Sequence, residues 1–144
     1  MAQITAEIQT VVFRLGSEEY AIDIGKVQEI IRMPEITALP QTPDYVLGVV
    51  NLRGNIIPVV DLKIRFSGKH TEANIETRVI VVEVGQNKVG IIVDAVSEVI
   101  KLPADQIVPA ESIHTSVHEE YVLGVARLDQ RLLIVLDVDK LLAV

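Results

Sequence analysis

The chain has 144 residues, a net charge of −7 and no cysteine, which excludes disulfides, thiol nucleophiles and cysteine-ligated metal sites. Acidic charge repels phosphate backbones, and aromatic residues make up only 3% of the chain, so we expect no nucleic-acid partner. No apolar run reaches the roughly 18 residues of a membrane span, and the N-terminus lacks a secretory signal, which favours a cytoplasmic protein without direct membrane insertion.

The apolar residues favour β-strands, because valine and isoleucine dominate a hydrophobic content of 49%. Runs of these residues come in pairs separated by short turns, the pattern of a β-hairpin. In chain order the predicted strand pairs are 10–16 with 19–24, 48–53 with 55–60, 78–85 with 88–94, and 124–129 with 131–136. Gly54 and Asn55 tolerate the positive φ of a tight turn. Pro58 predicts a strand edge or a bulge, because proline lacks the backbone donor.

Three short stretches carry helix signals: Gly25–Arg32, Asp61–Phe66 and Asp137–Ala143. In the first stretch, Val27, Ile30 and Ile31 fit a buried helical stripe, with a bent strand as the alternative. Asp61 and Asp137 each come directly after a predicted strand, which suits an N-cap that accepts backbone hydrogen bonds.

Two polar segments lie between the predicted elements. Residues 66–77, FSGKHTEANIET, are the best candidate for a linker, and residues 110–120 form a second loop that contains His114 and His118. The spacing of these histidines suggests zinc, but the stretch HTSVH lacks the glutamate of HExxH and a third ligand. We therefore expect solvated loop histidines and no metal site.

The sequence contains an internal repeat. Residues 45–54 read YVLGVVNLRG and residues 121–130 read YVLGVARLDQ, while VQEIIRMP at 27–34 returns as VSEVIKLP at 96–103. Two copies of about 70 residues indicate a duplicated small domain, because a solenoid needs three or more shorter units.

Short strands, frequent turns and little helix predict a mostly β fold of two small barrels, each a curled sheet of about five strands. Units of about 70 residues are marginally stable alone, so the two should pack around a shared hydrophobic seam. We expect a single domain over residues 10–142, with approximate subdomains at 10–66 and 78–142. The sequence leaves open an exchange of strands between the two halves.

The two copies diverge in charge at one turn, where Arg53 and Gly54 correspond to Asp129 and Gln130. One interpretation is drift at exposed positions. The other is recognition, because a guanidinium binds carboxylates bidentately and arginine is favoured in interface hot spots. A contact between Glu29 and Arg53 would contribute about 0 to 1 kcal/mol and would mainly orient the arginine.

Catalytic motifs are absent from the sequence, which has no GxSxG elbow, no GxxxxGK[ST] loop and no GxGxxG turn. We therefore expect no enzymatic activity and no cofactor. The competing interpretation is a small enzyme with Glu29 or Asp61 as general base, which predicts a concave site with a perturbed carboxylate.

Four stretches carry a resemblance to a known family. They are EEYAIDIGKVQEIIR, ITALPQTPDYVLGVVNLRGNIIPVVDL, VGIIVDAVSEVIKL and YVLGVARLDQRLLIVLDVDKLL, which together run from about Thr10 to Leu142. In these motifs the chain resembles the CheW-like domain family of bacterial chemotaxis, and within it the stand-alone coupling proteins. The resemblance implies two SH3-like five-stranded β-barrels packed around a common seam.

The resemblance also implies a non-enzymatic adaptor that links the cytoplasmic tips of methyl-accepting chemotaxis receptors to the histidine kinase CheA. Such an adaptor works in the cytoplasm at membrane-associated receptor arrays. The receptor tip, a helical hairpin, docks in the groove between the barrels, and the kinase is contacted through its own CheW-like regulatory domain. The alternative within the family is a regulatory fragment of a CheA kinase, or of a fusion between the adaptor and a receiver domain.

Family positions carried over to this sequence give a receptor-facing set. Its members are Val27, Glu29, Gly48, Asn51, Arg53 and Gly54, with Val89, Ile91 and Val93 in the stretch VGIIVD. Valine and isoleucine offer an apolar slot for a helix, and Arg53 at its rim would select an acceptor. No binding role is transferred to Arg127, Asp129 or Gln130. Kinase-contact residues stay unassigned, because they have no compact motif.

Overall fold

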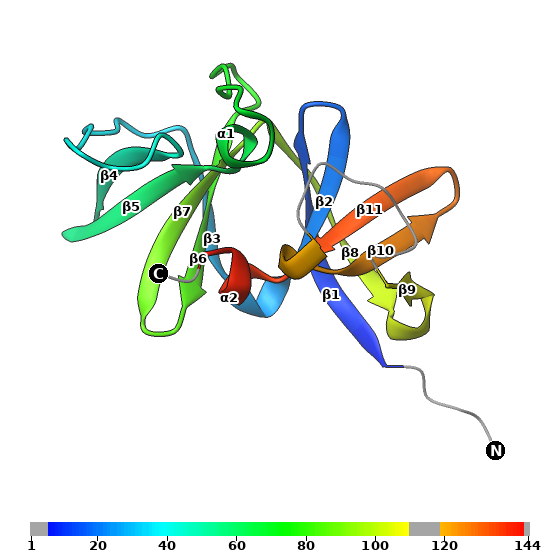
Figure 1. Ribbon diagram of the computed structural model, residues 1–144. Coiled ribbons are helices and arrows are strands. Elements are labelled where there is room, and N and C mark those ends of the chain that lie inside the picture. Colours follow the sequence, from blue (N-terminus) through cyan, green and yellow to red (C-terminus); the bar gives the residue numbers. More distant parts are fainter. Residues whose placement is uncertain (1–5, 110–118, 143–144) are drawn as a thin grey trace.

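The computed structural model describes residues 6–109 and 119–142, whose strands form two sheets (Figure 1). One sheet has six strands in the order β8 (Ala95–Pro103), β1 (Glu7–Leu15), β2 (Glu18–Asp23), β11 (Arg131–Leu136), β10 (Val122–Leu128) and β9 (Ile107–Val108). The other has five strands in the order β3 (Val27–Arg32), β6 (Arg78–Val84), β7 (Asn87–Val93), β5 (Asn55–Asp61) and β4 (Val46–Leu52). The predicted mostly β fold is confirmed, and the two-residue β9 brings one sheet to six strands.

Each sheet combines strands from both halves of the sequence. The hairpin of β1 and β2 pairs with β8 on one side and with β11 on the other, so it belongs to the six-stranded sheet. The hairpin of β6 and β7 pairs in the same way with β3 and β5 of the five-stranded sheet. Each repeat therefore contributes its first hairpin to the sheet that contains the later strands of the other repeat. As a result, neither sheet consists of residues 10–66 alone or of residues 78–142 alone.

All four predicted hairpins are present, as the antiparallel pairs β1–β2, β4–β5, β6–β7 and β10–β11. Pro58 does not lie on an edge strand, because β5 runs between β4 and β7. Pro58 pairs with Val49 of β4, near a register shift, and lies one residue before the pairing with β7 begins at Val59. Its missing N–H therefore leaves the β5–β7 hydrogen bonds intact.

Two of the three predicted helices are present. They are α1 (Leu62–Ser67) and α2 (Val138–Leu141), and the described residues also form the 3-10 turns η1 (Ile24–Lys26), η2 (Ala104–Gln106) and η4 (Glu119–Tyr121). Asp61 and Asp137 are the N-caps of α1 and α2, as predicted, and their carboxylates accept hydrogen bonds from the backbone N–H groups of Lys63 and Lys140.

The predicted helix over residues 25–32 is wrong. After η1, residues Val27–Arg32 form the edge strand β3, along which partly buried and exposed residues alternate. A burial period of two belongs to a strand, and the β-branched Val27, Ile30 and Ile31 favour an extended backbone.

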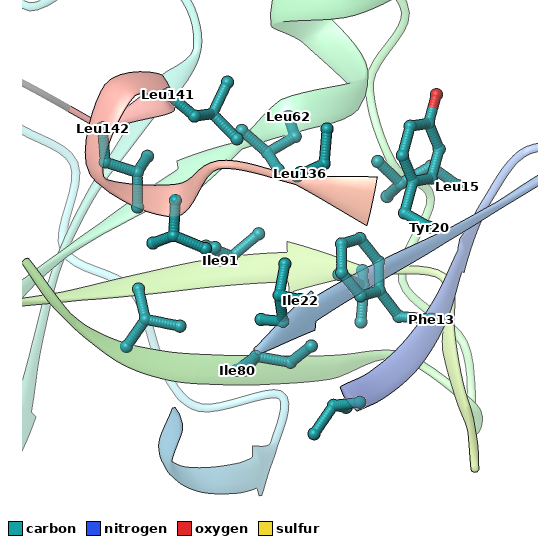
Figure 2. Packing of buried hydrophobic residues seen from close by; sticks show 14 of the residues in the cluster. Phe13, Leu15, Tyr20, Ile22, Leu62, Ile80, Ile91, Leu136, Leu141 and Leu142 are labelled. Atoms are coloured by element: carbon teal, nitrogen blue, oxygen red, sulfur yellow. The ribbon is translucent and has the colours of Figure 1, made fainter. Parts of the chain in front are cut away.

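The largest hydrophobic cluster lies between the two sheets. Its buried members come from both, among them Phe13 and Ile22 from β1 and β2, and Ile80 and Ile91 from β6 and β7 (Figure 2). Two smaller clusters each belong to one sheet. The large cluster is the predicted shared seam, and it includes the buried leucines of both short helices.

The two polar segments fall outside the sheets. Residues 68–77 connect α1 to β6, with Thr71 hydrogen-bonded to Asp61. His114 and His118 lie outside the described residues. Within the described ranges, no group of three or more histidine, cysteine, aspartate or glutamate residues is placed to hold a metal ion.

Candidate functional site

The turn between β4 and β5 presents Arg53 to a glutamate on the edge strand β3. Arg53 Nη2 donates to Glu29 Oε2 at 2.5 Å. Arg53 and Gly54 form a two-residue turn with φ angles of 51° and 87°, and Asn51 Oδ1 accepts from the Gly54 N–H at 2.9 Å. Asparagine and glycine favour this turn because they satisfy its local hydrogen bond and its positive φ. The structure thus brings these four residues together.

The strands β3 and β4 are the two edges of the five-stranded sheet. The Glu29–Arg53 ion pair joins β3 to the turn that follows β4, and so links the two edges. The Arg53 side chain is 69% exposed, whereas that of Glu29 is 27% exposed. Glu29 Oε1 is buried and has no hydrogen-bond partner among the described residues. The pair therefore offers a partner the remaining N–H donors of the exposed Arg53, held in place by the half-buried Glu29.

Val27 and Val89 lie on either side of Val82 in the same cross-strand row. Both are partly buried against the large cluster between the sheets. Ile91 and Val93 are 0% exposed within that cluster, so their side chains do not reach the surface. We therefore leave Ile91 and Val93 out of the surface considered below.

Gly48 is buried in β4 and lies against the segment that connects β3 to β4. Thr37 in that segment exchanges two backbone hydrogen bonds of 2.9 Å with Val49. The two backbones approach so closely at position 48 that a side chain would clash with Thr37, which accounts for the glycine. Because Thr37 covers Gly48, a partner cannot contact Gly48 directly.

The second repeat contains a similar arginine–glutamate contact that the sequence comparison missed. Glu98 of β8 corresponds to Glu29 in the repeat, and it accepts from Arg131 Nη1 at 2.9 Å. Arg131 also donates to both carboxylate oxygens of Glu19, at 3.0 and 2.8 Å. The hydrogen bond from Arg131 lowers the pKa of Glu19, with burial opposing it. Arg131 thus has its donors occupied by two glutamates, while Arg53 has one such partner in the part of the chain that the structure describes.

Six exposed apolar residues occupy matched positions in the two repeats, and we call them the matched apolar residues. They are Ile30, Leu39 and Ile56 in the first repeat and Val99, Val108 and Leu132 in the second, with exposures from 39% to 64%. The sequence analysis did not single them out, although the repeat alignment carried the signal. Exposed apolar residues repeated on both halves indicate protein-contact surfaces.

The two candidate catalytic carboxylates are held in other roles. Asp61 is 1% exposed, and its oxygens accept from the Lys63 N–H, the Thr71 N–H and the Thr71 hydroxyl. Glu29 is bound to Arg53. Four surface hollows of about 360 to 610 Å³ are lined by other residues. None of these four hollows is lined by Glu29 or Asp61.

Comparison with known proteins identifies the family. Residues 9–144 match the model of the CheW-like domain. The chain is 43% identical to chemotaxis protein CheW of Klebsiella aerogenes, over 99% of this chain and 86% of that protein. It is 36% identical to chemotaxis protein CheW of Treponema pallidum, over 98% and 85%.

A solved structure extends the likeness to the fold. The crystal structure of the scaffolding protein TtCheW from Thermoanaerobacter tengcongensis superposes with a TM-score of 0.88 at 37% identity, covering 100% of this chain and 93% of that one. Among the described residues, no helix is long and apolar enough to span a membrane. The chain therefore belongs to the CheW-like domain family, as a non-enzymatic scaffolding protein of chemotaxis.

Proposed function

We propose that this protein couples the cytoplasmic tips of methyl-accepting chemotaxis receptors to the histidine kinase CheA. The Glu29–Arg53 ion pair carries the proposal, because its arginine is 69% exposed and is oriented by a glutamate on the edge strand β3. A receptor helix that lies along β3 would bury apolar side chains against Val27 and Val89 and would give Arg53 a further acceptor.

The kinase contacts belong, in this proposal, to the matched apolar residues. Each repeat carries one set of three, so the protein offers the CheW-like regulatory domain of CheA two related surfaces. An interface of standard size takes about 800 Å² from each partner, and moderate affinity at each surface is enough when several contacts act together. Ile56 is the most exposed of the six, at 64%.

Residues 10–142 act as a single domain in this proposal. The cluster between the sheets and the exchange of first hairpins make each sheet depend on both repeats. The protein works in the cytoplasm and is recruited to the membrane-associated receptor array by binding to the receptor tips. Recruitment of this kind needs no contact with lipid.

The test mixes the purified chain with a receptor cytoplasmic fragment and CheA. We expect a ternary complex in size-exclusion chromatography at tens of micromolar, about −6 to −7 kcal/mol per contact, together with a changed rate of CheA autophosphorylation. Absence of the complex at that concentration would refute the proposal.

One variant and a matched control distinguish the kinase surface from the receptor surface. Ile56→Asp should weaken kinase binding and leave receptor binding unchanged. Ile75→Asp is the matched control, because Ile75 is 91% exposed on the connection before β6 and has no place in either surface. If both variants weaken kinase binding equally, the assignment of the matched apolar residues is wrong.

A further inference from the structure

Arg65 of α1 lies between two tyrosines that correspond to each other in the repeat. Its guanidinium carbon is 5.0 Å from the ring centroid of Tyr45 and 4.9 Å from that of Tyr121. Both distances are within the range of a cation–π contact. Tyr45 directly precedes β4 and Tyr121 directly precedes β10, so a single cation touches both sheets at equivalent places.

Hydrogen bonds extend this arrangement to the second helix. Arg65 Nη2 donates to the Tyr121 hydroxyl at 3.1 Å, and Nη1 donates to the backbone carbonyl of Leu141 in α2. Leu141 is the residue that corresponds to Arg65 in the repeat. Arg65 therefore joins α1 to α2. The two repeats differ here, because the first has this arginine and the second has the buried Leu141 at the corresponding position.

Each tyrosine is fixed to the corner of its own sheet. The Tyr45 carbonyl accepts from the Asp61 N–H at 2.7 Å, and the Tyr121 carbonyl accepts from the Asp137 N–H at 2.8 Å. These aspartates are the caps that end β5 and β11 and begin the two helices. A cation between the tyrosines thus ties the β5–α1 corner of one sheet to the β11–α2 corner of the other.

The large cluster between the sheets is apolar, and polar contacts at a second place join the β1–β2 turn to Asp94, which accepts from the Gly16 N–H at 2.6 Å and lies 3.4 Å from Lys63 Nζ. Apolar packing is non-directional, whereas a planar guanidinium that binds two rings and a carbonyl has a defined geometry. We infer that Arg65 is a positioning residue that sets the orientation of the two sheets relative to each other. The consequence for receptor docking rests on the proposed function, but the orientation itself does not.

The absence of native cysteine makes a direct measurement possible. Lys88→Cys on β7 and Lys101→Cys on β8 place one spin label on an exposed position of each sheet. We expect a narrow distance distribution by pulsed electron paramagnetic resonance, and a broadened or shifted one after Arg65→Met. Arg127→Met, at an exposed position on β10, is the matched control and should leave the distribution unchanged.

A second variant covers the case in which Arg65→Met does not fold, which circular dichroism would reveal. Tyr121→Phe keeps the ring and removes only the hydroxyl that Arg65 binds, so it should broaden the distribution to a smaller extent. Arg65→Lys keeps the charge without the planar fork and should fall between wild type and Arg65→Met. Distributions of folded Arg65→Met, or of Tyr121→Phe in its place, that match wild type would overturn the inference.

Binding measurements connect the orientation to function. Arg65→Met should lower the affinity for a receptor cytoplasmic fragment about tenfold, while affinity for the CheA regulatory domain stays within about twofold, because each matched apolar set lies on one sheet and its adjoining connection. Equal losses for both partners would show general damage and contradict a positioning role. If wild-type protein does not bind the receptor fragment, the proposed function fails, and the distance measurement still decides the role of Arg65.

Discussion

The carbonyl oxygen of Thr37 lies 2.1 Å from the point that a Cβ atom on Gly48 would occupy. This contact belongs to the crossing of the β3–β4 connection over β4, where Thr37 and Val49 pair. Gly124, the repeat counterpart of Gly48, has the same relationship to β9, since its Cβ would lie 2.7 Å from the Val108 carbonyl oxygen. The duplication has thus preserved one close backbone crossing in each sheet.

Gly48→Ala should lower the free energy of unfolding by about 2 to 4 kcal/mol, from overpacking against Thr37 and from a φ of 148° that alanine tolerates poorly. Urea unfolding measures the loss. Gly85→Ala is the control, because Gly85 also has a positive φ but has no atom within 4 Å of the added Cβ, so its cost should stay near 1 kcal/mol. Equal losses would mean that backbone conformation alone explains Gly48.

Local features of the fold were predictable from the sequence. Hairpins depend on short turns such as Gly16 and Gly54, and the caps Asp61 and Asp137 depend on residues a few positions away. The pairing of each first hairpin with the other repeat's strands was not predictable, because repeated sequences are compatible with either partner. Residues 25–32 were misassigned because a short apolar run fits both a helical and a strand period.

The site was predictable only in part. The Glu29–Arg53 contact joins residues that the sequence had already singled out, whereas the Glu98–Arg131 contact was not predicted, because Asp129 stands where the repeat places Arg53. In space, Arg131 takes that role two residues later, beside Glu19. Glu19 belongs to the first repeat, and its counterpart in the second repeat is Lys88 of β7, the strand that pairs with β5. The residue on the neighbouring strand therefore differs between the two sheets, and no local sequence pattern shows which arginine has a second glutamate beside it.

Arg53→Glu should abolish receptor binding while changing the free energy of unfolding by about 1 kcal/mol or less, because an exposed ion pair contributes little to stability. Isothermal titration with a receptor cytoplasmic fragment, beside urea unfolding, separates the two effects. Arg127→Glu makes the same charge change at an exposed position in the second repeat and should bind normally. If the Arg53→Glu variant binds the receptor fragment normally, or if it unfolds, the assignment of Arg53 to the receptor-binding surface is wrong.

Asp61→Ala should destabilise the protein by about 2 to 3 kcal/mol, because it removes a helix cap and leaves the Thr71 N–H and hydroxyl without their acceptor. Asp137→Ala removes only the cap bond to the Lys140 N–H, at 3.2 Å, and should cost about 1 kcal/mol. Thermal unfolding of the two variants compares them directly. A larger loss for Asp137→Ala would contradict the role given to Thr71.

Stability should fall in acid through the pairing of Glu19 with Arg131. The hydrogen bond from Arg131 lowers the pKa of Glu19 in the folded protein from its usual value of 4.5. A lowered pKa means that the pair stabilises the fold above pH 4.5 and that this contribution is lost as the pH falls further, toward the pKa in the folded state. At pH 7, Glu19→Gln should therefore be less stable than wild type, by about 1 kcal/mol.

A double-mutant cycle isolates this contribution from other carboxylates. The coupling between Glu19→Gln and Arg131→Met, measured by urea unfolding, should be favourable at pH 7 and should decline at each step below pH 4.5, because protonated Glu19 can no longer accept a charge-assisted pair of bonds. Arg131→Met alone should cost more than Glu19→Gln, since Arg131 also binds Glu98. A coupling that stays constant between pH 7 and pH 3 would show that the bidentate contact does not stabilise the fold through its charge.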